Sequence, residues 1–496
     1  MFFFILNHNF IAIVPEIFLV ISINIVLVYS VVFCTSNYLN YPLLLNNVTW
    51  LCIQVLIFTF LLNVNNQLYN LTIFDGLLIV DLFGISVKNF VLLSCISILL
   101  FSLNYNRYDF INNFEFPLLL ILAILGTLLL ISSYDLITMY LSLELQSFCS
   151  YILTALKRNS EFSSEAGLKY FILGAFSSGF LLFGCSLLYG LTGTTNYKNL
   201  FLFSFNISSS LYNIDGFLLG IIFIAISFLF KVSAAPFHFW SPDIYEGSPT
   251  IVTLFFVAIP KLGVFTFFLR LFFDSFYSFF FFWQYIIIFA SFFSMLIGSL
   301  GAIWQLKLKR LIAFSGINHV GLMLICLCCS SFEGVFSLIF YLLVYIIMSL
   351  SAFLLLIVTR KNYNLKKLKY IEDLITVSKA NRFLGTSLII SFFSIAGIPP
   401  FIGFFSKMFV FFCALGQSIY FLSFVGLFTS VISCFYYLRI IQLSFFEHTN
   451  NWISIKKINR ESSFLISMLT FSLFLFGLHS KFFVIFVHNL SFYLCL

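Results

Sequence analysis

The fold is decided by residues 386–415, which read TSLIISFFSIAGIPPFIGFFSKMFVFFCAL. The stretch is apolar, and it is longer than the roughly 20 residues that a helix needs to cross a bilayer. Gly397, Pro399 and Pro400 stand in its middle. Proline removes a backbone donor and clashes with the preceding turn, so we expect the helix to break at mid-membrane. Lys407 follows directly after this break.

A second apolar stretch is interrupted in the same way. Residues 228–240 read FLFKVSAAPFHFW, with Pro236 after a run of small residues and Lys231 just before it. In lipid the freed backbone groups need partners, so a broken helix persists only inside protein or beside a wet cavity. At each position a simple kink without a transport role is the alternative. Paired broken helices in inverted repeats, however, are typical of a transport path at mid-depth.

The composition indicates that most of the chain lies in a membrane. Hydrophobic residues make up 61% of the 496 residues and charged residues only 9%, whereas soluble domains carry about 25% charged residues. The net charge of +7 does not indicate nucleic-acid binding, because the cations form short clusters between hydrophobic runs and not a basic face. We therefore predict an all-α polytopic membrane protein.

We predict about 14 transmembrane helices from the lengths of the apolar runs. They cover residues 10–33, 43–62, 82–103, 116–132, 134–156, 167–191, 216–239, 250–272, 284–304, 311–330, 333–358, 386–415, 419–446 and 462–486. The two interrupted spans are the seventh and the twelfth. They lie five spans apart, and five is odd, so two repeats of five spans would be inverted relative to each other in the membrane.

The cations are distributed asymmetrically over the loops. Loops after even-numbered spans hold little beyond Lys198 and Arg270. Loops after odd-numbered spans hold most of the others: Arg107, Lys157, Arg158, Lys307, Lys309, Arg310, Arg360, Lys361, Lys366, Lys367, Lys369, Lys379, Arg382, Lys456, Lys457 and Arg460. The positive-inside rule assigns the second group to the matrix or cytoplasmic side, so both termini are expected on the outer side. The first formal charge is Glu16, and we expect no cleaved leader.

Five ionisable residues are predicted at membrane depth, where a charge costs at least about 2.5–3.5 kcal/mol. They are Glu144 in span five, Lys169 in span six, Lys231 in span seven, Lys261 in span eight and Lys407 in span twelve. Burial disfavours the charged form of an amine, and a nearby carboxylate favours it again. Such a pair can therefore take up and release a proton, which arginine cannot do.

For several single residues a structural role is the alternative. Lys169 could snorkel to the inner surface, and Glu144 could be a structural hydrogen-bond partner. His319 in span ten could relay a proton or be a buried packing residue, and His238 could border the inner aqueous edge. The 11 cysteines lie mostly in apolar runs and lack paired CxxC motifs, so we predict no metal or iron–sulfur site.

Four motifs resemble those of subunit 2 of respiratory NADH dehydrogenase, complex I. They are EFSSEAGLKYFILGAFSSGFLLFG, KVSAAPFHFWSPDIYEGSPTIVT, LKRLIAFSGINHVGLML and SIAGIPPFIGFFSK. The resemblance covers roughly residues 115 to 445. The phrase Asp243-Ile244-Tyr245-Glu246-Gly247 is similar to subunit 2 rather than to the sister subunits 4 and 5.

The resemblance implies two inverted five-helix bundles, spans 4–8 and 9–13, each with one broken helix. It implies a proton-translocating role for Glu144, Lys169, Lys231, Lys261 and Lys407. It places NADH, FMN, iron–sulfur clusters and ubiquinone in partner subunits, with no cofactor in this chain. The expected partners are other membrane-arm subunits, especially antiporter-like subunit 4 and the small membrane subunits. The expected location is the mitochondrial inner membrane, or alternatively a bacterial plasma membrane.

We accordingly expect four parts: an N-terminal three-helix segment (1–110), a first repeat (111–275), a second repeat (276–446) and a C-terminal helix and tail (447–496). Three rival functions remain. A free-standing cation/proton antiporter would share the broken helices but would not co-purify with flavin-bearing subunits. A membrane scaffold would tolerate loss of the buried lysines. A redox enzyme would need a nucleotide fingerprint that the sequence lacks.

Overall fold

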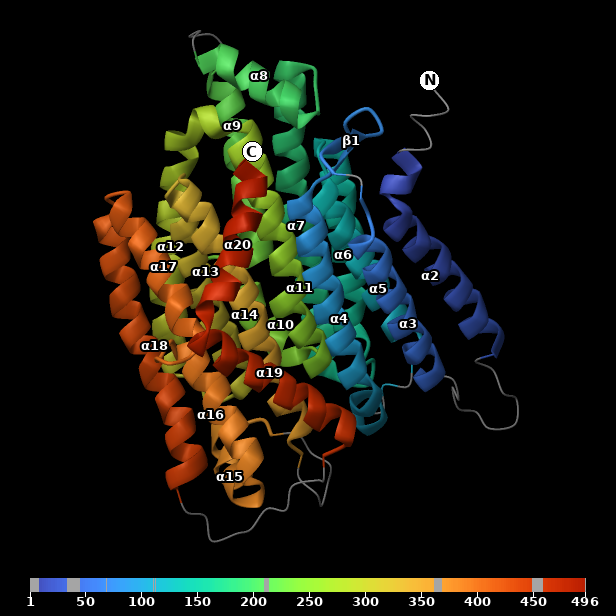
Figure 1. Ribbon diagram of the computed structural model, residues 1–496, viewed down its shortest axis with the longest axis vertical. Coiled ribbons are helices and arrows are strands. Elements are labelled where there is room, and N and C mark those ends of the chain that lie inside the picture. Colours follow the sequence, from blue (N-terminus) through green and yellow to red (C-terminus); the bar gives the residue numbers. More distant parts are fainter. Residues whose placement is uncertain are drawn as a thin grey trace. The chain divides into compact units, whose positions relative to one another are not determined.

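The computed structural model describes residues 9–33, 45–67, 69–109, 111, 113–208, 214–360, 368–447 and 458–495. Five cations of the predicted inner loops lie outside the described residues, namely Lys361, Lys366, Lys367, Lys456 and Lys457. The side chain of Arg107 is also not described. The described chain is nearly all helical (Figure 1), which confirms the predicted all-α polytopic fold class.

The N-terminal segment consists of three long helices and one small hairpin. The helices are α2 (Val14–Phe33), α3 (Leu45–Val64) and α4 (Leu82–Asp109). Between α3 and α4 lie the antiparallel strands β1 (Leu71–Ile73) and β2 (Leu78–Val80). This hairpin was not predicted from the sequence, because strands of three residues have too little alternation to be recognised.

The following part of the chain contains the first broken helix. Its elements are α5 (Glu115–Ser132), α6 (Leu136–Ala155), α7 (Glu161–Thr192), α8 (Tyr197–Ser208), α9 (Ile214–Val232), α10 (Trp240–Gly247), α11 (Thr250–Leu269), the π-helix η1 (Arg270–Ser275) and the 3-10 helix η2 (Tyr277–Phe279). Span seven, predicted as 216–239, ends as a helix at Val232, and α10 resumes after seven residues. The predicted helix therefore extends too far, because Ser233 already adopts a positive φ of 65°.

The last part of the chain contains the second broken helix. Its elements are α12 (Phe280–Ile303), α13 (Leu308–Cys328), α14 (Phe332–Val358), η3 (Ile371–Thr376), α15 (Val377–Ala380), α16 (Arg382–Ala396), α17 (Ile402–Gly416), α18 (Tyr420–Phe446), α19 (Arg460–Leu478) and α20 (Ser480–Cys495). The predicted span 462–486 was wrong as a single helix. It divides at His479 into α19 and α20.

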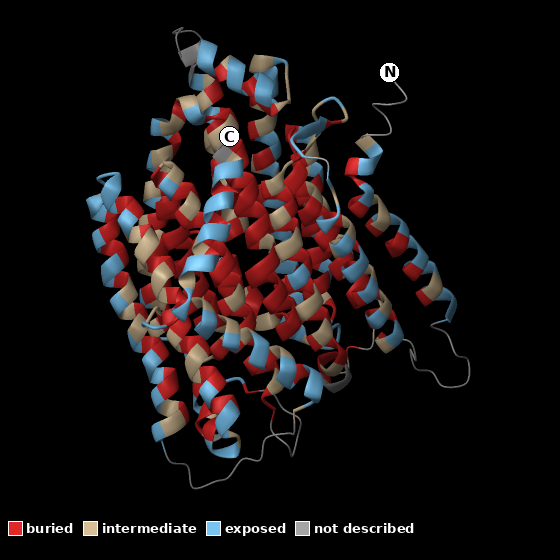
Figure 2. Ribbon diagram, viewed as in Figure 1, coloured by how far each residue is buried: buried red, intermediate tan, exposed pale blue. Residues whose placement is uncertain are grey.

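Within the described residues, 13 helices are long and apolar enough to cross a membrane. The broken span twelve, whose halves α16 and α17 are each too short to be counted, brings the total to the predicted 14. Helices α13 and α14 are buried over nearly their whole lengths (Figure 2). A helix that is apolar all round and buried inside protein marks the interior of a bundle.

The chain divides into two compact units. Unit 1 comprises Met1–Lys231 and Ile259–Trp283, together with Leu496, and unit 2 comprises Val232–Ala258 and Gln284–Cys495. The four-part division expected from the sequence, with boundaries after residues 110, 275 and 446, stays a prediction.

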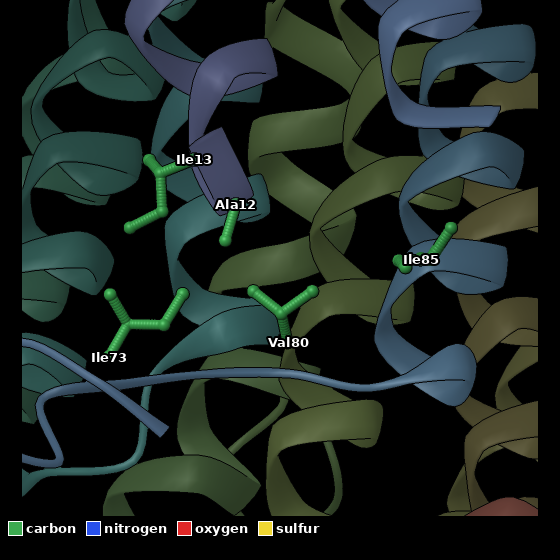
Figure 3. Packing of buried hydrophobic residues seen from close by; sticks show 5 residues of the cluster. All are labelled: Ala12, Ile13, Ile73, Val80 and Ile85. Atoms are coloured by element: carbon green, nitrogen blue, oxygen red, sulfur yellow. The ribbon is translucent and has the colours of Figure 1, made fainter. Parts of the chain in front are cut away.

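Within unit 1 a small hydrophobic cluster anchors the hairpin. Its members are Ala12, Ile13, Ile73, Val80 and Ile85. Figure 3 shows Ile73 and Val80 of the hairpin close to Ala12 and Ile13 from the start of the chain.

Candidate functional site

In unit 1 an acid and an amine lie on two candidate membrane-spanning helices without a direct bond between them. Lys231 lies in the last turn of α9. Its Nζ is inaccessible and has no hydrogen-bond partner among the described residues. Glu144 of α6 is the charged group that acts electrostatically on this amine. The two residues therefore interact electrostatically, while Lys231 Nζ makes no hydrogen bond to Glu144.

Glu144 is held by the helix on which it stands. The Ser147 hydroxyl donates to the Glu144 carbonyl at 3.0 Å and lies 3.4 Å from Glu144 Oε2. The start of α6 is fixed by Asp135, whose side chain accepts a hydrogen bond from the Ile137 amide at 2.8 Å. Such N-terminal caps stabilise a helix by about 0.5–2 kcal/mol. The backbone that carries Glu144 is thus well anchored, while the carboxylate keeps acceptor sites for further partners.

Lys261 is the second buried amine of unit 1. It lies in α11 and is only 5% exposed. Pro260 lies inside the same helix directly before it. Proline has no amide hydrogen, so it cannot donate to the carbonyl one turn earlier in the helix.

Lys169 differs from these residues. Its side chain is 44% exposed, and its Nζ pairs with Glu165 Oε1 at 2.7 Å, one turn earlier on α7. Exposed i,i+4 pairs of this kind stabilise a helix by only about 0.3–0.5 kcal/mol. This geometry fits a lysine that extends to the membrane surface as well as one that carries a proton. The proton-carrying role of Lys169 stays a prediction.

In unit 2, Lys407 caps the broken helix. Its side chain is buried, and its Nζ donates to the carbonyl of Ala396, the last residue of α16, at 2.6 Å. The C-terminal end of a helix carries partial negative charge, so the ammonium is stabilised by the helix dipole as well as by the hydrogen bond. The Cys434 thiol lies 3.5 Å from the same carbonyl.

Two glycines make this arrangement possible. Gly397 adopts a φ of +81°, and a Cβ built there would lie 2.8 Å from Lys407 Cδ and 3.2 Å from Lys407 Nζ. On the far side of the break, a Cβ at Gly403 would lie 1.8 Å from the Ser394 carbonyl oxygen. The break therefore depends on residues without side chains, which let Lys407 lie against the end of α16.

His319 is the centre of a buried polar cluster in unit 2. The residue is 3% exposed, and its Nδ1 lies 2.7 Å from the Tyr341 hydroxyl. Its Nε2 lies 3.5 Å from the Tyr437 hydroxyl, and its ring packs against Tyr345 at a centroid distance of 5.4 Å. Both ring nitrogens thus have a hydroxyl nearby, an arrangement that suits either a relay or a satisfied core histidine.

The acidic residues of the segment Asp243–Gly247 bind the basic start of α13. Glu246 pairs with Lys307 and with Arg310, and Arg310 Nη2 lies 2.9 Å from Asp243 Oδ1. These contacts tie α10, which follows the first break, to the N-terminal end of α13. The nearby His238 is buried, with its ring against that of Phe239.

No group of three or more His, Cys, Asp or Glu residues that could hold a metal ion exists in the described parts of the chain.

Comparison with known proteins gives the family. The family model for the transmembrane part of NADH:quinone oxidoreductase and Mrp antiporter subunits matches residues 133–433. The NADH-ubiquinone oxidoreductase chain 2 of Marchantia polymorpha is 44% identical over 493 residues, which are 99% of this chain and 100% of that protein. This chain belongs to the NADH:quinone oxidoreductase/Mrp antiporter family.

A further relative is similar in sequence, and a solved structure has the same fold. The NADH-quinone oxidoreductase subunit N of Pelagibacter ubique is 42% identical over 444 residues, covering 89% of this chain and 90% of its own. A chain of respiratory complex I from Thermus thermophilus has the same fold, with a TM-score of 0.78 at 24% identity over 95% of this chain and 98% of its own. The family match contains Glu144, Lys231, Lys261 and Lys407 within its bounds.

Two ion pairs of this chain, one buried and one partly buried, were not predicted from the sequence. Lys88 Nζ of α4 lies 2.6 Å from Glu16 Oε1 of α2, and each side chain is 7% exposed. Arg270 pairs with Asp81 and is not the loop cation that we predicted, because it lies buried in η1. The four charged residues lie inside or at the ends of predicted spans one, three and eight, which is a visible signal of a buried charge. The two members of each pair are too far apart in the sequence for a local pattern to show that they are partners.

Proposed function

We propose that this chain is the second antiporter-like subunit of a proton-pumping NADH:ubiquinone oxidoreductase, and that it moves protons along its buried acid and amines. The contact that carries the proposal is the Lys407 ammonium bound to the Ala396 carbonyl at the end of a helix that stops inside a span. A buried lysine is costly in a membrane and marks ion or proton pathways by default. Paired broken helices support the same function.

The proposed step in unit 1 is a proton release controlled by distance. While Glu144 is near, its negative charge favours the ammonium form of Lys231. When the carboxylate moves away, the buried amine gives up its N–H proton to a neighbouring water or base, and the electron pair stays on the nitrogen. Lys231 suits this step because its Nζ has no hydrogen-bond partner among the described residues that would hold the proton.

In unit 2 the proposed carrier is Lys407. Its protonated form is stabilised by the Ala396 carbonyl and by the negative end of the α16 dipole. Loss of the proton removes the charge–dipole attraction, so protonation and the position of the side chain are linked. The His319 cluster, with Tyr341 and Tyr437, supplies hydroxyls that can pass a proton onward.

The remaining parts of the proposal rest on the resemblance of the chain's motifs to subunit 2 of complex I. NADH oxidation, FMN, iron–sulfur clusters and ubiquinone reduction belong to partner subunits, and quinone chemistry there drives the charge movements in this chain. The partners are other membrane-arm subunits, including antiporter-like subunit 4. The proposed location is the mitochondrial inner membrane, since the relatives that match over nearly the full length, from land plants, bear the name NADH-ubiquinone oxidoreductase chain 2.

The antiporter alternative uses the same fold, so the fold does not separate the two functions. Sequence favours the oxidoreductase subunit, because the 44% identity extends over the whole of the Marchantia chain. Mild-detergent purification distinguishes them. A particle of complex I size with NADH dehydrogenase activity supports the proposal, and a flavin-free antiporter assembly contradicts it.

Mutation of the switch pair tests the mechanism in the intact complex. Glu144→Gln or Lys231→Met should lower proton pumping and NADH-to-quinone turnover, while NADH oxidation by an artificial acceptor stays normal. Glu161→Gln, an exposed acid in the first turn of α7, is the matched control for the first change. Normal pumping and turnover in both site variants would mean that the relay assignment is wrong.

A further inference from the structure

A group of charged side chains joins the helix after the first break to the start of α13. This inner clasp consists of Asp243 and Glu246 of α10, Lys307 directly before α13, and Lys309 and Arg310 in the first turn of α13. All five residues belong to unit 2, on the side that the cation distribution assigns to the matrix or cytoplasm. The proposed proton route does not use them.

Arg310 and Lys307 bind the two acids along the side of α10. Arg310 Nη2 lies 2.9 Å from Asp243 Oδ1, and Arg310 Nε pairs with Glu246. Lys307 also pairs with Glu246, which is the less exposed of the two acids. Asp243 and Glu246 stand three residues apart, so they share one face of the helix. A planar guanidinium can bind both acids at once, which the single ammonium of a lysine does less well.

The two ends of α10 are held as well. At its start, the Ser241 amide and hydroxyl donate to the carbonyl of His238, a residue of the first break, at 3.0 and 3.1 Å. At its end, Lys309 Nζ donates to the Ser248 carbonyl at 2.6 Å. The C-terminal end of a helix carries partial negative charge, so an ammonium is favourable there. Helix α10 therefore connects the first break to the start of α13.

A short backbone contact continues this connection toward the second break. Lys307 and Tyr370 form an isolated antiparallel bridge. Beside it, the Leu308 amide donates to the Lys369 carbonyl at 3.0 Å. Tyr370 directly precedes η3, and its amide donates to Asp373 Oδ2 at 3.2 Å. The segment that carries the cations is therefore bonded through its backbone to the start of η3.

From η3 the chain continues without a long loop to the second break. Helices α15 and α16 follow η3, and α16 ends at Ala396. The Ser378 hydroxyl of α15 donates to the Ser444 carbonyl of α18, which anchors the start of this segment. The other end of α16 presents the Ala396 carbonyl that binds Lys407. Packed and hydrogen-bonded elements of this kind can carry energetic coupling between distant sites.

We propose that Arg310 is a positioning residue, which acts with Asp243 and Glu246 to couple the first broken helix to the binding of Lys407 at the second break. The inference rests on the proposed function. The two states are a closed clasp, with Arg310 on both acids, and an open clasp. When the clasp opens, η3 loses its connection to α10, and α16 can shift relative to Lys407. A shift of about 1 Å at the Ala396 carbonyl takes the 2.6 Å contact beyond hydrogen-bonding distance.

Hydrogen–deuterium exchange of backbone amides in the purified complex tests the connection. Arg310→Gln removes the charge and should speed amide exchange in α10 and also in residues 393–403, across the second break. A partly exposed ion pair shifts an equilibrium by up to about fivefold, so the exchange rates should rise about two- to fivefold. Arg310→Lys keeps the charge but cannot bind both acids equally well, so its rates should be intermediate. Arg439→Gln, the same change at an exposed arginine of α18, is the control.

The exchange result at the second break decides the inference. If residues 393–403 exchange at the control rate in both Arg310 variants, the inference is overturned, even if α10 exchanges faster, because the clasp then stabilises only its own helix. If Arg310→Gln does not assemble, Glu246→Gln takes its place with the same expected result, since it removes the acid that Arg310 and Lys307 share.

Proton pumping in proteoliposomes tests whether the connection acts through Lys407. Arg310→Gln should lower the proton yield per NADH relative to Arg439→Gln, and Lys407→Arg should lower it further. The double variant should pump as well as Lys407→Arg alone, because the clasp then has no carrier to position. A normal yield in Arg310→Gln, or a double variant that pumps less than Lys407→Arg, overturns the inference but not the proposed function. A normal yield in Lys407→Arg contradicts both.

Discussion

The substitution Gly397→Ala tests the position of Lys407 most specifically among the backbone changes. Gly397 has a φ of +81°, where a residue with a Cβ costs about 1–2 kcal/mol. The added Cβ would also lie 2.8 Å from Lys407 Cδ, closer than real Cβ atoms come, and 3.1 Å from Lys407 Cε, which is a tight contact. The lysine side chain must then shift, and we expect it to lose its 2.6 Å contact with the Ala396 carbonyl.

The loss of this contact sets the size of the effect. A hydrogen bond to a charged group is worth about 1.5–3 kcal/mol. The population of complexes with Lys407 on the Ala396 carbonyl should therefore fall by roughly 10- to 100-fold, since each 1.4 kcal/mol is a factor of ten. If this arrangement is part of the proton route, pumping should fall with it.

The assay is NADH-driven proton uptake into proteoliposomes that contain the purified complex. Gly416→Ala on α17 is the matched control, because a Cβ there has its nearest neighbour, Glu333 Oε2, at 3.8 Å. Gly397→Asn separates strain from displacement, since asparagine tolerates the left-handed conformation but still carries a Cβ. Pumping by Gly397→Ala and Gly397→Asn that equals pumping by Gly416→Ala would refute the reasoning.

Three further predictions concern other parts of the chain. Glu16→Gln or Lys88→Met leaves a buried charge unpaired and should destabilise the N-terminal segment by about 3–5 kcal/mol, whereas the double variant should be less affected. Equal assembly yields of the complex in all three variants would contradict this prediction. Tyr341→Phe removes the 2.7 Å contact with His319 and should slow proton pumping, whereas the same change at the exposed Tyr420 should not. Identical pumping rates in the two variants would mean that His319 is only a packing residue. Gly403→Ala places a Cβ 1.8 Å from the Ser394 carbonyl oxygen and should block assembly of the complex, while Gly179→Ala adds a Cβ in open space and should assemble normally. A stable Gly403→Ala complex would show that the backbone at the break can rearrange.

The features that depend on local sequence could be predicted. Hydropathy gave the spans, because a bilayer sets their length. Proline positions gave both breaks, because a proline acts on its own helix turn. The division of the last span at His479 and the hairpin Leu71–Val80 have weak local signals and were missed.

The contacts between distant residues could not be predicted. Glu16 and Lys88 are far apart in the chain, and only the packing of α2 beside the other N-terminal helices brings them to 2.6 Å. Arg270 was assigned to a loop because it follows an apolar run, but the π-helix turns it into the protein, where it meets Asp81. The Ala396 carbonyl as partner of Lys407 was also invisible, because a backbone acceptor has no letter in the sequence.

The most direct measurement of the central claim is the proton yield per NADH of the Lys407→Arg complex. Arginine keeps the positive charge and can still donate to the Ala396 carbonyl, but it does not release its proton. If Lys407 carries a proton, this variant should assemble yet pump fewer protons than Lys481→Arg, the same change at an exposed lysine of α20. If Lys407→Arg pumps as well as that control, the amine only caps a helix, and proton transfer through it is contradicted.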